Sequence, residues 1–337
     1  MDDFTCGNNS TNVLLTIAIP TYNRAAYLDL CLGQVFKQVK QYESLVEIII
    51  SDNCSTDNTA EIVQGYARNG FKFRYVRNDE NVGADRNFAQ CFALASGKYV
   101  LIFGDDDILL DGAIDRILAV LKAGEYGLVY LNSYGFISDY HLEMPRKRKT
   151  GTVVYIDRAR FIEKINYWIT FASGNIVNKS LLDTDFNPDE FVGTNLVQLN
   201  WVLSAIFAAK ENAVIEDYLV AYKSANTGGY QLCQVFGVNI NRIFDVFVAN
   251  GISRKYFDII NRKLVQTFFP NLIVMQRKQS GGFTFEAEDY FKTLRQVFGR
   301  YGSFWIFTAP VIKLPLRLAS VWSKLCGKLF KFVQLVK

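Results

Sequence analysis

Five short apolar segments alternate with four segments of helical periodicity over residues 14–131, and this alternation limits the possible folds more than any other feature of the chain. The expected strands are 14–20, 46–51, 71–76, 99–103 and 128–131, and the expected helices are 24–40, 57–68, 83–95 and 112–123. Strands that are joined through helices by short connections form a mainly parallel sheet with helices on both faces. The sequence therefore predicts a Rossmann-like α/β domain.

Composition supports a folded enzyme and excludes several classes of chemistry. Half of the 337 residues are hydrophobic, so the chain can bury a substantial core. The net charge of +4 is modest and gives no reason to expect a nucleic-acid partner. Six scattered cysteines without a CxxC pair predict free thiols in a reducing compartment. Because His141 is the only histidine, Ser-His-Asp, Cys-His and HExxH sites are nearly excluded.

The ends of the chain lack the signals of export or membrane insertion. The N-terminal MDDFTCGNNST has neither the basic nor the apolar region of a secretory signal. No uninterrupted apolar run reaches the roughly 18 residues that a spanning helix needs. We therefore expect a cytoplasmic protein.

The segment KYVLIFGDDDILL at residues 98–110 ends an apolar run abruptly in Asp105, Asp106 and Asp107. Adjacent carboxylates repel one another, so a fold tolerates them best around a hard divalent cation that is itself bound to a diphosphate. The carboxyl end of a strand is also where open α/β sheets bind ligands. A solvated acidic turn that caps the next helix is the alternative explanation.

Polar residues also follow the first expected strand. Pro20 ends this strand, and Thr21, Tyr22 and Asn23 come directly after it. Their hydroxyl, ring and amide groups can contact a nucleotide.

Two more strands are followed by polar loops. Asp52 and Asn53 follow the second strand, where Asp52 can accept a hydrogen bond from a base N–H, whereas Asp57 fits better as a helix N-cap. After the third strand, Gly83 allows close approach of the backbone and Arg86 can neutralise phosphate. Because the carboxyl ends of parallel strands meet at one edge, the four loops predict a nucleotide crevice that ends in a metal site.

The segments TIAIPTYNR, EIIISDNCSTDNT, RNDENVGADRNF and YVLIFGDDD together resemble the nucleotide-binding half of family 2 glycosyltransferases with the GT-A fold. The resemblance is close over residues 13–115 and looser to about 222. It implies a nucleotide-sugar donor, Mg²⁺ or Mn²⁺, and transfer with inversion at the anomeric carbon. It also implies that Asp52 contacts the base and that the three aspartates hold the metal and the donor ribose.

Two positions depart from the family pattern. Many members have L-D-x-D-D where this chain has F-G-D-D-D, so the roles within the triplet stay open. We expect Asp107 to bind the metal, together with Asp105, and Asp105 and Asp106 to contact the donor. The Glu-Asp pair that supplies the family's catalytic base is missing from residues 191–195. The nearest carboxylates, Asp189 and Glu190, are the candidate bases, or else ordinary loop acids near a helix start.

We expect a GT-A-like catalytic domain at 1–225, with a nucleotide-sugar-binding half at 13–131 and an acceptor side at 132–225, followed by a helical extension at 226–337. A helix is expected over 195–210 of the acceptor side. The basic tail at 303–337 contains no acid. Its apolar residues recur at helical spacing, at Leu318, Trp322, Leu325, Leu329, Phe332 and Val336. Such a basic amphipathic helix suits an anionic membrane surface, and a terminal helix packed on the core is the alternative.

The expected function is that of a metal-dependent glycosyltransferase. It would move a sugar, such as a deoxyhexose, from a nucleotide-sugar to a lipid-linked glycan at the inner face of the plasma membrane. The F-G-D-D-D variant and the length are similar to bacterial O-antigen sugar transferases, including abequosyltransferase-like enzymes that use CDP-deoxysugars.

Two other functions remain open. A sugar nucleotidyltransferase would be expected to have a glycine-rich basic loop after the first strand, and PTYNR has one basic residue and no glycine. A non-catalytic glycan-binding or scaffold protein on a degenerate GT-A fold is supported only by the missing Glu-Asp pair.

Overall fold

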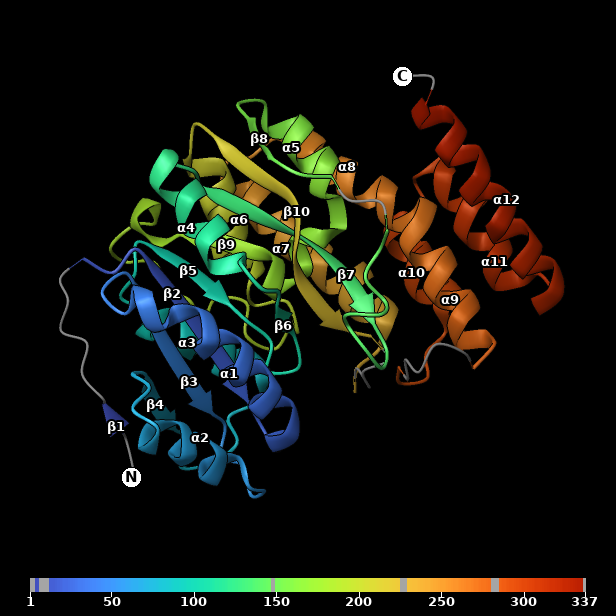
Figure 1. The fold of residues 1–337 in the computed structure, drawn as a ribbon. Coiled ribbons are helices and arrows are strands. Elements are labelled where there is room, and N and C mark those ends of the chain that lie inside the picture. The colour runs from blue at the N-terminus through green and yellow to red at the C-terminus, as the bar shows by residue number, and fades with distance from the viewer. Residues whose placement is uncertain (1–3, 6–11, 147–148, 225–228, 280–284, 336–337) are drawn as a thin grey trace. The chain divides into compact units, whose positions relative to one another are not determined.

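The computed structural model describes residues 4–5, 12–146, 149–224, 229–279 and 285–335 (Figure 1). The chain divides into two compact units. Unit 1 comprises residues 1–161 and 168–223, and unit 2 comprises residues 162–167 and 224–337.

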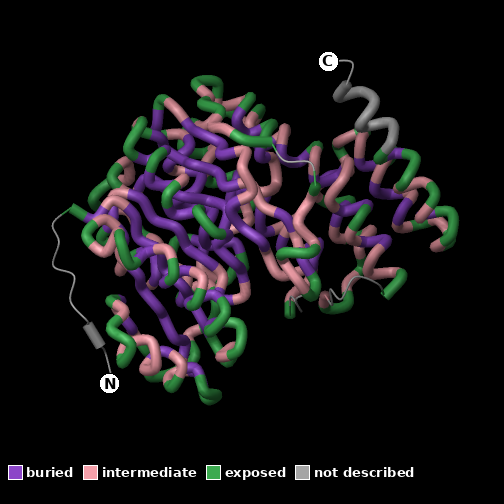
Figure 2. The backbone as a smooth tube through the Cα atoms, viewed as in Figure 1, coloured by how far each residue is buried: buried purple, intermediate pink, exposed green. Residues whose placement is uncertain are grey.

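One sheet forms the centre of unit 1, and Figure 2 shows that its strands are largely buried. Its strand order is β1-β4-β3-β2-β5-β9-β7-β10-β6, with β8 also paired to β10. The strands are β1 (Phe4–Thr5), β2 (Leu15–Thr21), β3 (Val46–Asp52), β4 (Arg74–Arg77), β5 (Tyr99–Ile102), β6 (Ile108–Leu109), β7 (Leu128–Phe136), β8 (Thr152–Tyr155), β9 (Asn175–Asn178) and β10 (Asn212–Lys223).

The predicted parallel arrangement is confirmed across β4, β3, β2 and β5, which are parallel neighbours. β9 is antiparallel to both β5 and β7, so these two strands are parallel to each other without being neighbours. β6 and β8 are antiparallel to β10, so antiparallel pairs dominate beyond β5. β7 extends five residues past its predicted end at 131, because Tyr134 and Phe136 pack in a second small core with Ile108 and Leu110.

Helices cover both faces of the sheet, as predicted. They are α1 (Ala25–Val39), α2 (Thr59–Arg68), α3 (Ala84–Leu94), α4 (Ala113–Ala123), α5 (Arg158–Ile165) and α6 (Leu199–Ala208). Apolar residues of α1, α2 and α4 share one core with Leu15, Ile17 and Ile19, which alternate along β2. α3 packs on the other face, where Asn87 donates to the backbone carbonyl of Ser51 at 3.0 Å.

The N-cap of α2 is Asn58 and not the predicted Asp57, which lies one residue earlier and still bonds to the start of the helix. The Asp57 carboxylate accepts the backbone N–H of Thr59 at 3.1 Å, in the first turn of α2. It also accepts the backbone N–H of Ala25 at 3.0 Å, at the start of α1. One carboxylate therefore binds the first backbone N–H of each of two helices and connects them.

Unit 2 is helical and rich in aromatic residues. Its helices are α7 (Ile240–Ala249), α8 (Arg254–Lys263), α9 (Phe269–Arg277), α10 (Tyr290–Phe298), α11 (Ala309–Lys313) and α12 (Leu316–Leu335), with π-helical turns at Gln234–Asn239, Leu264–Phe268 and Phe304–Thr308. Phe244 stacks on Phe257 with a ring-centroid distance of 4.5 Å. Between these helices the amides of Asn241 and Asn261, both buried, bond to each other.

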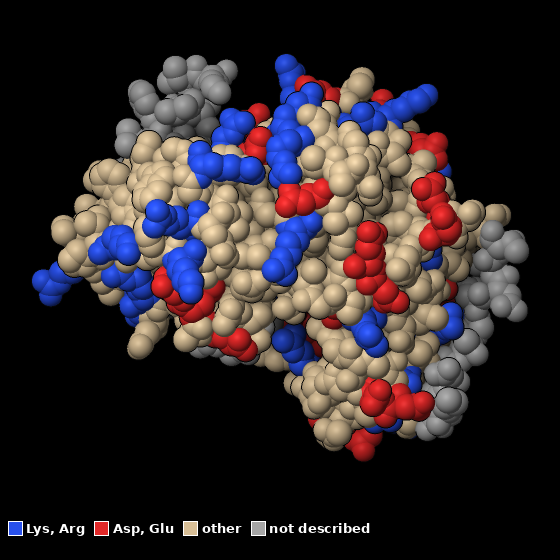
Figure 3. Space-filling model, turned by 180° about the vertical axis from the view of Figure 1, so that it is seen from behind, with Lys and Arg blue, Asp and Glu red and all other residues tan. Residues whose placement is uncertain are grey.

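Within the described ranges, no helix has the length and apolar character needed to cross a bilayer. Figure 3 shows one face of the surface, on which lysines and arginines are interspersed with acidic side chains over much of the area.

Candidate active site

The carboxyl ends of β2, β3 and β4 lie in register at one edge of the sheet. Thr21 at the end of β2 pairs with Asp52 at the end of β3, and Asp52 pairs with Arg77 at the end of β4. β5 is parallel to β2, and the aspartate triad Asp105–Asp107 follows it directly. The structure therefore brings the four predicted loops to the same edge.

Side-chain hydrogen bonds connect these loops. Asn23 Oδ1 accepts the backbone N–H of Thr56 at 2.7 Å, which joins the loop after β2 to the loop after β3. Asn53 Oδ1 accepts the backbone N–H of Val82 at 3.0 Å, and Asn53 Nδ2 donates to Asn81 at 2.7 Å. Two of the predicted nucleotide-contacting residues, Asn23 and Asn53, thus also hold the edge of the sheet together.

Asp105 is buried and already has two partners. The Thr21 hydroxyl donates to Asp105 Oδ2 at 2.7 Å. The Arg24 guanidinium lies 3.2 Å from Asp105 Oδ1 and 3.1 Å from Asp106 Oδ2. Arg24 therefore supplies the positive charge nearest to the first two aspartates.

Asp107 is buried on the other side of the triad. Its Oδ1 accepts the backbone N–H of Lys223, at the end of β10, at 3.1 Å. The Ser173 hydroxyl also bonds to Asp107, and its oxygen accepts the backbone N–H of Gly104 at 2.8 Å. Since Ser173 lies in the turn two residues before β9, the inserted antiparallel strand positions this hydroxyl at the triad.

The triad is electrostatically strained. Burial raises the pKa of Asp105 to about 6, and the charge of Asp106 adds to the rise while Arg24 opposes it. Burial, together with the charge of Asp106, raises the pKa of Asp107 to about 8. Such shifts mark a site in which the carboxylates lack sufficient positive charge.

Three side-chain oxygen atoms converge beside Gly104. A Cβ atom at Gly104 would lie 3.0 Å from Asp107 Oδ2, 3.2 Å from Asp106 Oδ1 and 3.3 Å from Ser173 Oγ. In the described part of the chain no three His, Cys, Asp or Glu residues form a preassembled metal cluster. Mg²⁺ needs only one or two protein carboxylates when substrate phosphates complete its shell. The all-oxygen surroundings of Gly104 therefore fit a divalent cation.

Asp52 is completely buried at the end of β3. Its Oδ2 accepts the Tyr75 hydroxyl at 2.7 Å, and its Oδ1 accepts the backbone N–H of Ser55 at 2.8 Å. Arg77 Nε lies 3.5 Å from the same carboxylate. The structure therefore shows Asp52 as an anchor of the loop after β3, and its contact with a base stays a prediction.

The first loop differs in one detail from the sequence prediction. Pro20 does not end the strand but is paired with Ser51 inside β2, and the strand ends at Thr21. A proline is tolerated there because the pairing of β2 with β5 stops at Ala18, so no ladder partner needs its missing N–H. Tyr22 follows with 42% of its surface exposed, available to a ligand.

Arg86 and Asp189 lie together. Both line a pocket of about 320 Å³ between α3 and residues 188–192, together with Gln90. Glu190 is exposed beside it. Gly83, just before α3, has φ of 87°, a conformation that favours glycine.

The loop before α6 is held by Asp85, which the sequence prediction missed. The Asp85 carboxylate accepts the backbone N–H groups of Gly193 and Asn195, each at 2.8 Å. Gly193 and Asn195 have φ of 89° and 57°, so the chain cannot be helical there. For this reason the helix predicted from residue 195 begins only at Leu199.

Three further residues of the site were missed, namely Arg24, Ser173 and Lys223. Arg24 stands directly after Asn23 in PTYNR, so an acidic triplet in need of a cation could have identified it. Ser173 and Lys223 act through strands β9 and β10, whose neighbours along the sheet could not be read from local patterns.

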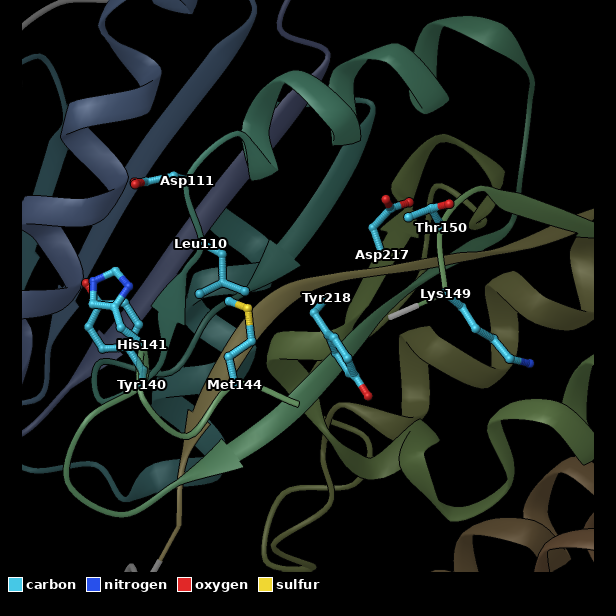
Figure 4. Close-up of a pocket in the computed structure, with 9 residues that line it drawn as sticks. All are labelled: Leu110, Asp111, Tyr140, His141, Met144, Lys149, Thr150, Asp217 and Tyr218. Carbon is cyan, nitrogen blue, oxygen red and sulfur yellow. The ribbon is translucent and has the colours of Figure 1, made fainter. Parts of the chain in front are cut away.

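A separate pocket of about 300 Å³ in unit 1 contains His141, the only histidine (Figure 4). Its carboxylates already have partners. Asp217 accepts Arg116 Nε at 3.2 Å, and Asp111 accepts Lys37 Nζ at 2.9 Å. The imidazole lies beside the Tyr140 ring, with a centroid distance of 4.1 Å. These acids stabilise the fold and are not arranged as a catalytic set with His141.

Comparison with known proteins agrees with this geometry. The family model described as Glycosyl transferase family 2 matches residues 16–186. Abequosyltransferase RfbV of Salmonella typhimurium is 45% identical over 98 residues, which are 29% of this chain and 29% of that protein. The GalNAc(5)-diNAcBac-PP-undecaprenol beta-1,3-glucosyltransferase of Campylobacter jejuni is 31% identical over 186 residues, which are 53% of this chain and 56% of that protein. The chain thus spans between about a third and somewhat more than half of these two relatives.

Among solved structures, residues 1–349 of S. aureus TarS superpose with a TM-score of 0.63 at 17% identity, over 92% of this chain and 88% of that chain. TarS has also been solved in complex with UDP-GlcNAc, with a TM-score of 0.62. At this level of identity the likeness concerns the fold.

Proposed function

This chain belongs to the family 2 glycosyltransferases and has their GT-A fold, and we propose that it transfers a sugar from a nucleotide-sugar donor to a lipid-linked oligosaccharide of a bacterial surface polysaccharide such as O-antigen. The observation that carries the proposal is the aspartate triad after β5, in which Asp105 and Asp107 are buried and to which Thr21 and Arg24, at the end of β2, bond. Two relatives named for sugar transfer, one of them to an undecaprenol-linked glycan, support this class of donor and acceptor.

The donor diphosphate is expected to lie at the triad, with Mg²⁺ or Mn²⁺. Asp107 and Asp106, whose oxygens lie close to Gly104, are the ligands that we propose. Asp105, which the sequence also suggests as a ligand, contacts Arg24, and its binding to the metal stays a prediction. When bound, the cation would neutralise charge on the departing nucleoside diphosphate. Arg24 adds a second positive group at the same place.

The acceptor hydroxyl must lose a proton as it attacks the anomeric carbon from the face opposite the leaving group, which gives inversion. We propose Asp189 or Glu190 as the base, because both are exposed carboxylates in the segment that leads to α6. Asp189 also lines the pocket that contains Arg86.

Release of nucleoside diphosphate tests the proposal directly. UDP-, GDP-, CDP- and dTDP-sugars are incubated with the protein and Mn²⁺, and we expect one of them to be hydrolysed slowly and to raise the melting temperature. Asp107→Ala should abolish release, whereas Asp111→Asn, an exposed acid paired with Lys37, should keep it. If no donor is bound or hydrolysed, the proposal is wrong. Release of pyrophosphate from a nucleoside triphosphate and a sugar phosphate would indicate a nucleotidyltransferase instead.

The base is tested separately in the transfer reaction. Asp189→Asn or Glu190→Gln should lower kcat by roughly 10²–10⁴-fold while donor binding stays unchanged. Asp183→Asn, another exposed acid of the same segment, is the matched control. Unchanged turnover in both variants would exclude these residues as the base.

The lipid-linked acceptor places the reaction at a membrane. We propose that the protein binds peripherally to the inner face of the plasma membrane through its basic C-terminal region.

A further inference from the structure

Large apolar side chains are exposed close together near the C-terminal end of unit 2. They are Trp305, Ile306, Leu318, Val321 and Leu325, with exposed fractions of 46%, 55%, 56%, 55% and 50%. We call these five residues the 305–325 patch. Exposed apolar groups that cluster in this way usually mark a binding surface.

The patch is formed by two elements that contact each other. On α12, Ala319 and Cys326 are buried, whereas Leu318, Val321 and Leu325 recur at spacings of three and four residues on the exposed side. The Trp322 indole N–H donates to the backbone carbonyl of Ile306 at 2.9 Å. This bond places the turn with Trp305 and Ile306 beside the exposed side of α12.

This arrangement corrects part of the predicted stripe. Trp322 is only partly exposed and connects the two elements, and Val321 joins Leu318 and Leu325 on the outer face. Leu329 and Phe332 lie outside the residues whose side chains the structure describes, and Val336 lies outside the described residues altogether.

The segment that carries the patch has charges of one sign. The sequence contains no Asp or Glu after Asp289. Lys313, Arg317 and Lys324 are exposed close in sequence to the apolar residues. The segment therefore combines exposed apolar side chains with cations alone.

We propose that the 305–325 patch docks on the surface of an anionic lipid bilayer. Indole rings and aliphatic side chains insert at the boundary between headgroups and acyl chains, while lysine and arginine pair with lipid phosphates. The proposal deepens the proposed function, because a lipid-linked acceptor would be presented at such a surface.

A second copy of the chain is a poorer partner. A symmetric contact places the same patch on both sides, so cations of one copy, such as Arg317 and Lys324, would lie near cations of the other. Interfaces between proteins are also depleted in lysine. An anionic surface satisfies both the apolar and the cationic parts of the patch.

The test measures binding of the full-length protein to vesicles without donor or acceptor. Vesicles of phosphatidylcholine with an equal amount of phosphatidylglycerol should sediment the protein, and vesicles of phosphatidylcholine alone should not. The double substitution Leu318→Ser with Leu325→Ser should weaken binding about tenfold or more, as should Arg317→Gln with Lys324→Gln. Leu30→Ser, at a position of α1 that is 63% exposed, is the matched control and should bind normally.

Two results would overturn the proposal. One is unchanged vesicle binding by both double variants. The other is a dimer in solution that these variants dissociate without any effect on vesicles. Donor hydrolysis in solution separates this proposal from the proposed function, because it should be normal in the Leu318→Ser, Leu325→Ser protein. If the protein bound vesicles but hydrolysed no donor, the membrane-docking proposal would be supported and the proposed function would be wrong.

Discussion

Two regions of unit 1 are built in opposite ways: the edge that we propose binds the donor, called the donor edge, and the segment 183–192 that we propose faces the acceptor, called the acceptor segment. At the donor edge, buried polar side chains bond across neighbouring loops, as Thr21 does with Asp105 and Tyr75 with Asp52. In residues 183–192 the acids Asp183, Asp189 and Glu190 are exposed. The donor edge is therefore preorganised, whereas the acceptor segment presents side chains that can change without disturbing the core.

This difference suggests where specificity can vary. A rigid donor edge suits the step that every transfer from a nucleoside-diphosphate sugar must perform, which is stabilisation of a departing diphosphate. A solvent-exposed acceptor segment can accept different side chains for different glycans at little cost in stability. Substitutions at the donor edge should therefore impair every reaction. Substitutions in the acceptor segment, other than at the proposed bases Asp189 and Glu190, should change acceptor affinity alone.

The largest effect is expected at Asp107. Asp107→Asn should reduce turnover by about a thousandfold, because it removes the proposed metal ligand and the charge that faces the diphosphate. The same change should raise the free energy of unfolding, because the buried carboxylate, whose pKa is raised to about 8, is costly to ionise. Kinetics and urea denaturation of the same sample measure both. A variant that lost activity together with stability would contradict this account of the donor edge.

A smaller effect is expected at Gly104. Gly104→Ala places a methyl group 3.0 Å from Asp107 Oδ2 and should weaken Mn²⁺ and donor binding by about tenfold to a hundredfold. Binding is measured by titration calorimetry. Gly65→Ala in α2 is the control, because nothing lies within 4 Å of the new methyl group, and it should stabilise the protein by about 0.5–1 kcal/mol. If Gly104→Ala bound Mn²⁺ as tightly as the unsubstituted protein, the oxygen atoms beside Gly104 would not be those that hold the cation.

The two regions also differ in how far the sequence predicts them. Strands β2 to β5 and the edge residues Asn23, Asn53 and Asp105 follow from local periodicity and from the rule that parallel strands end at one edge. Ser173 and Lys223 could not be predicted, because β9 is inserted between β5 and β7 and local patterns do not reveal strand order.

Local patterns also fail where the chain leaves regular structure. The helix expected from residue 195 begins at Leu199, since the Asp85 carboxylate binds the backbone of residues 193 and 195 in a non-helical form. A contact over more than a hundred residues of sequence leaves no local signal. The roles of Asp189 and Glu190 stay predictions, because the residues around an exposed acid in the sequence do not reveal which group it contacts.

The pH dependence of stability gives a further test of the donor edge. In the presence of a chelator, the folded protein keeps protons on Asp105 and Asp107 up to pKa values of about 6 and about 8, whereas the unfolded chain loses them near the ordinary value of about 4. The unfolded state therefore binds fewer protons, so these two groups stabilise the fold fully below about pH 4 and lose that effect as the pH rises toward 8. Asp107→Asn should flatten the decline in melting temperature over this range. An equally steep decline in that variant would assign the effect to other groups.

The smallest effect is expected at Asp85, which anchors the acceptor segment. Asp85→Ala leaves the N–H groups of Gly193 and Asn195 without their carboxylate and should free the loop before α6. Loss of about 1 kcal/mol of anchoring corresponds to an increase of about fivefold in KM for the acceptor, with donor binding unchanged. Asp85→Asn keeps one acceptor oxygen and should recover part of the loss. If Asp85→Ala instead weakened donor binding, the two regions would be coupled, and the acceptor segment would have to be regarded as part of the preorganised donor edge.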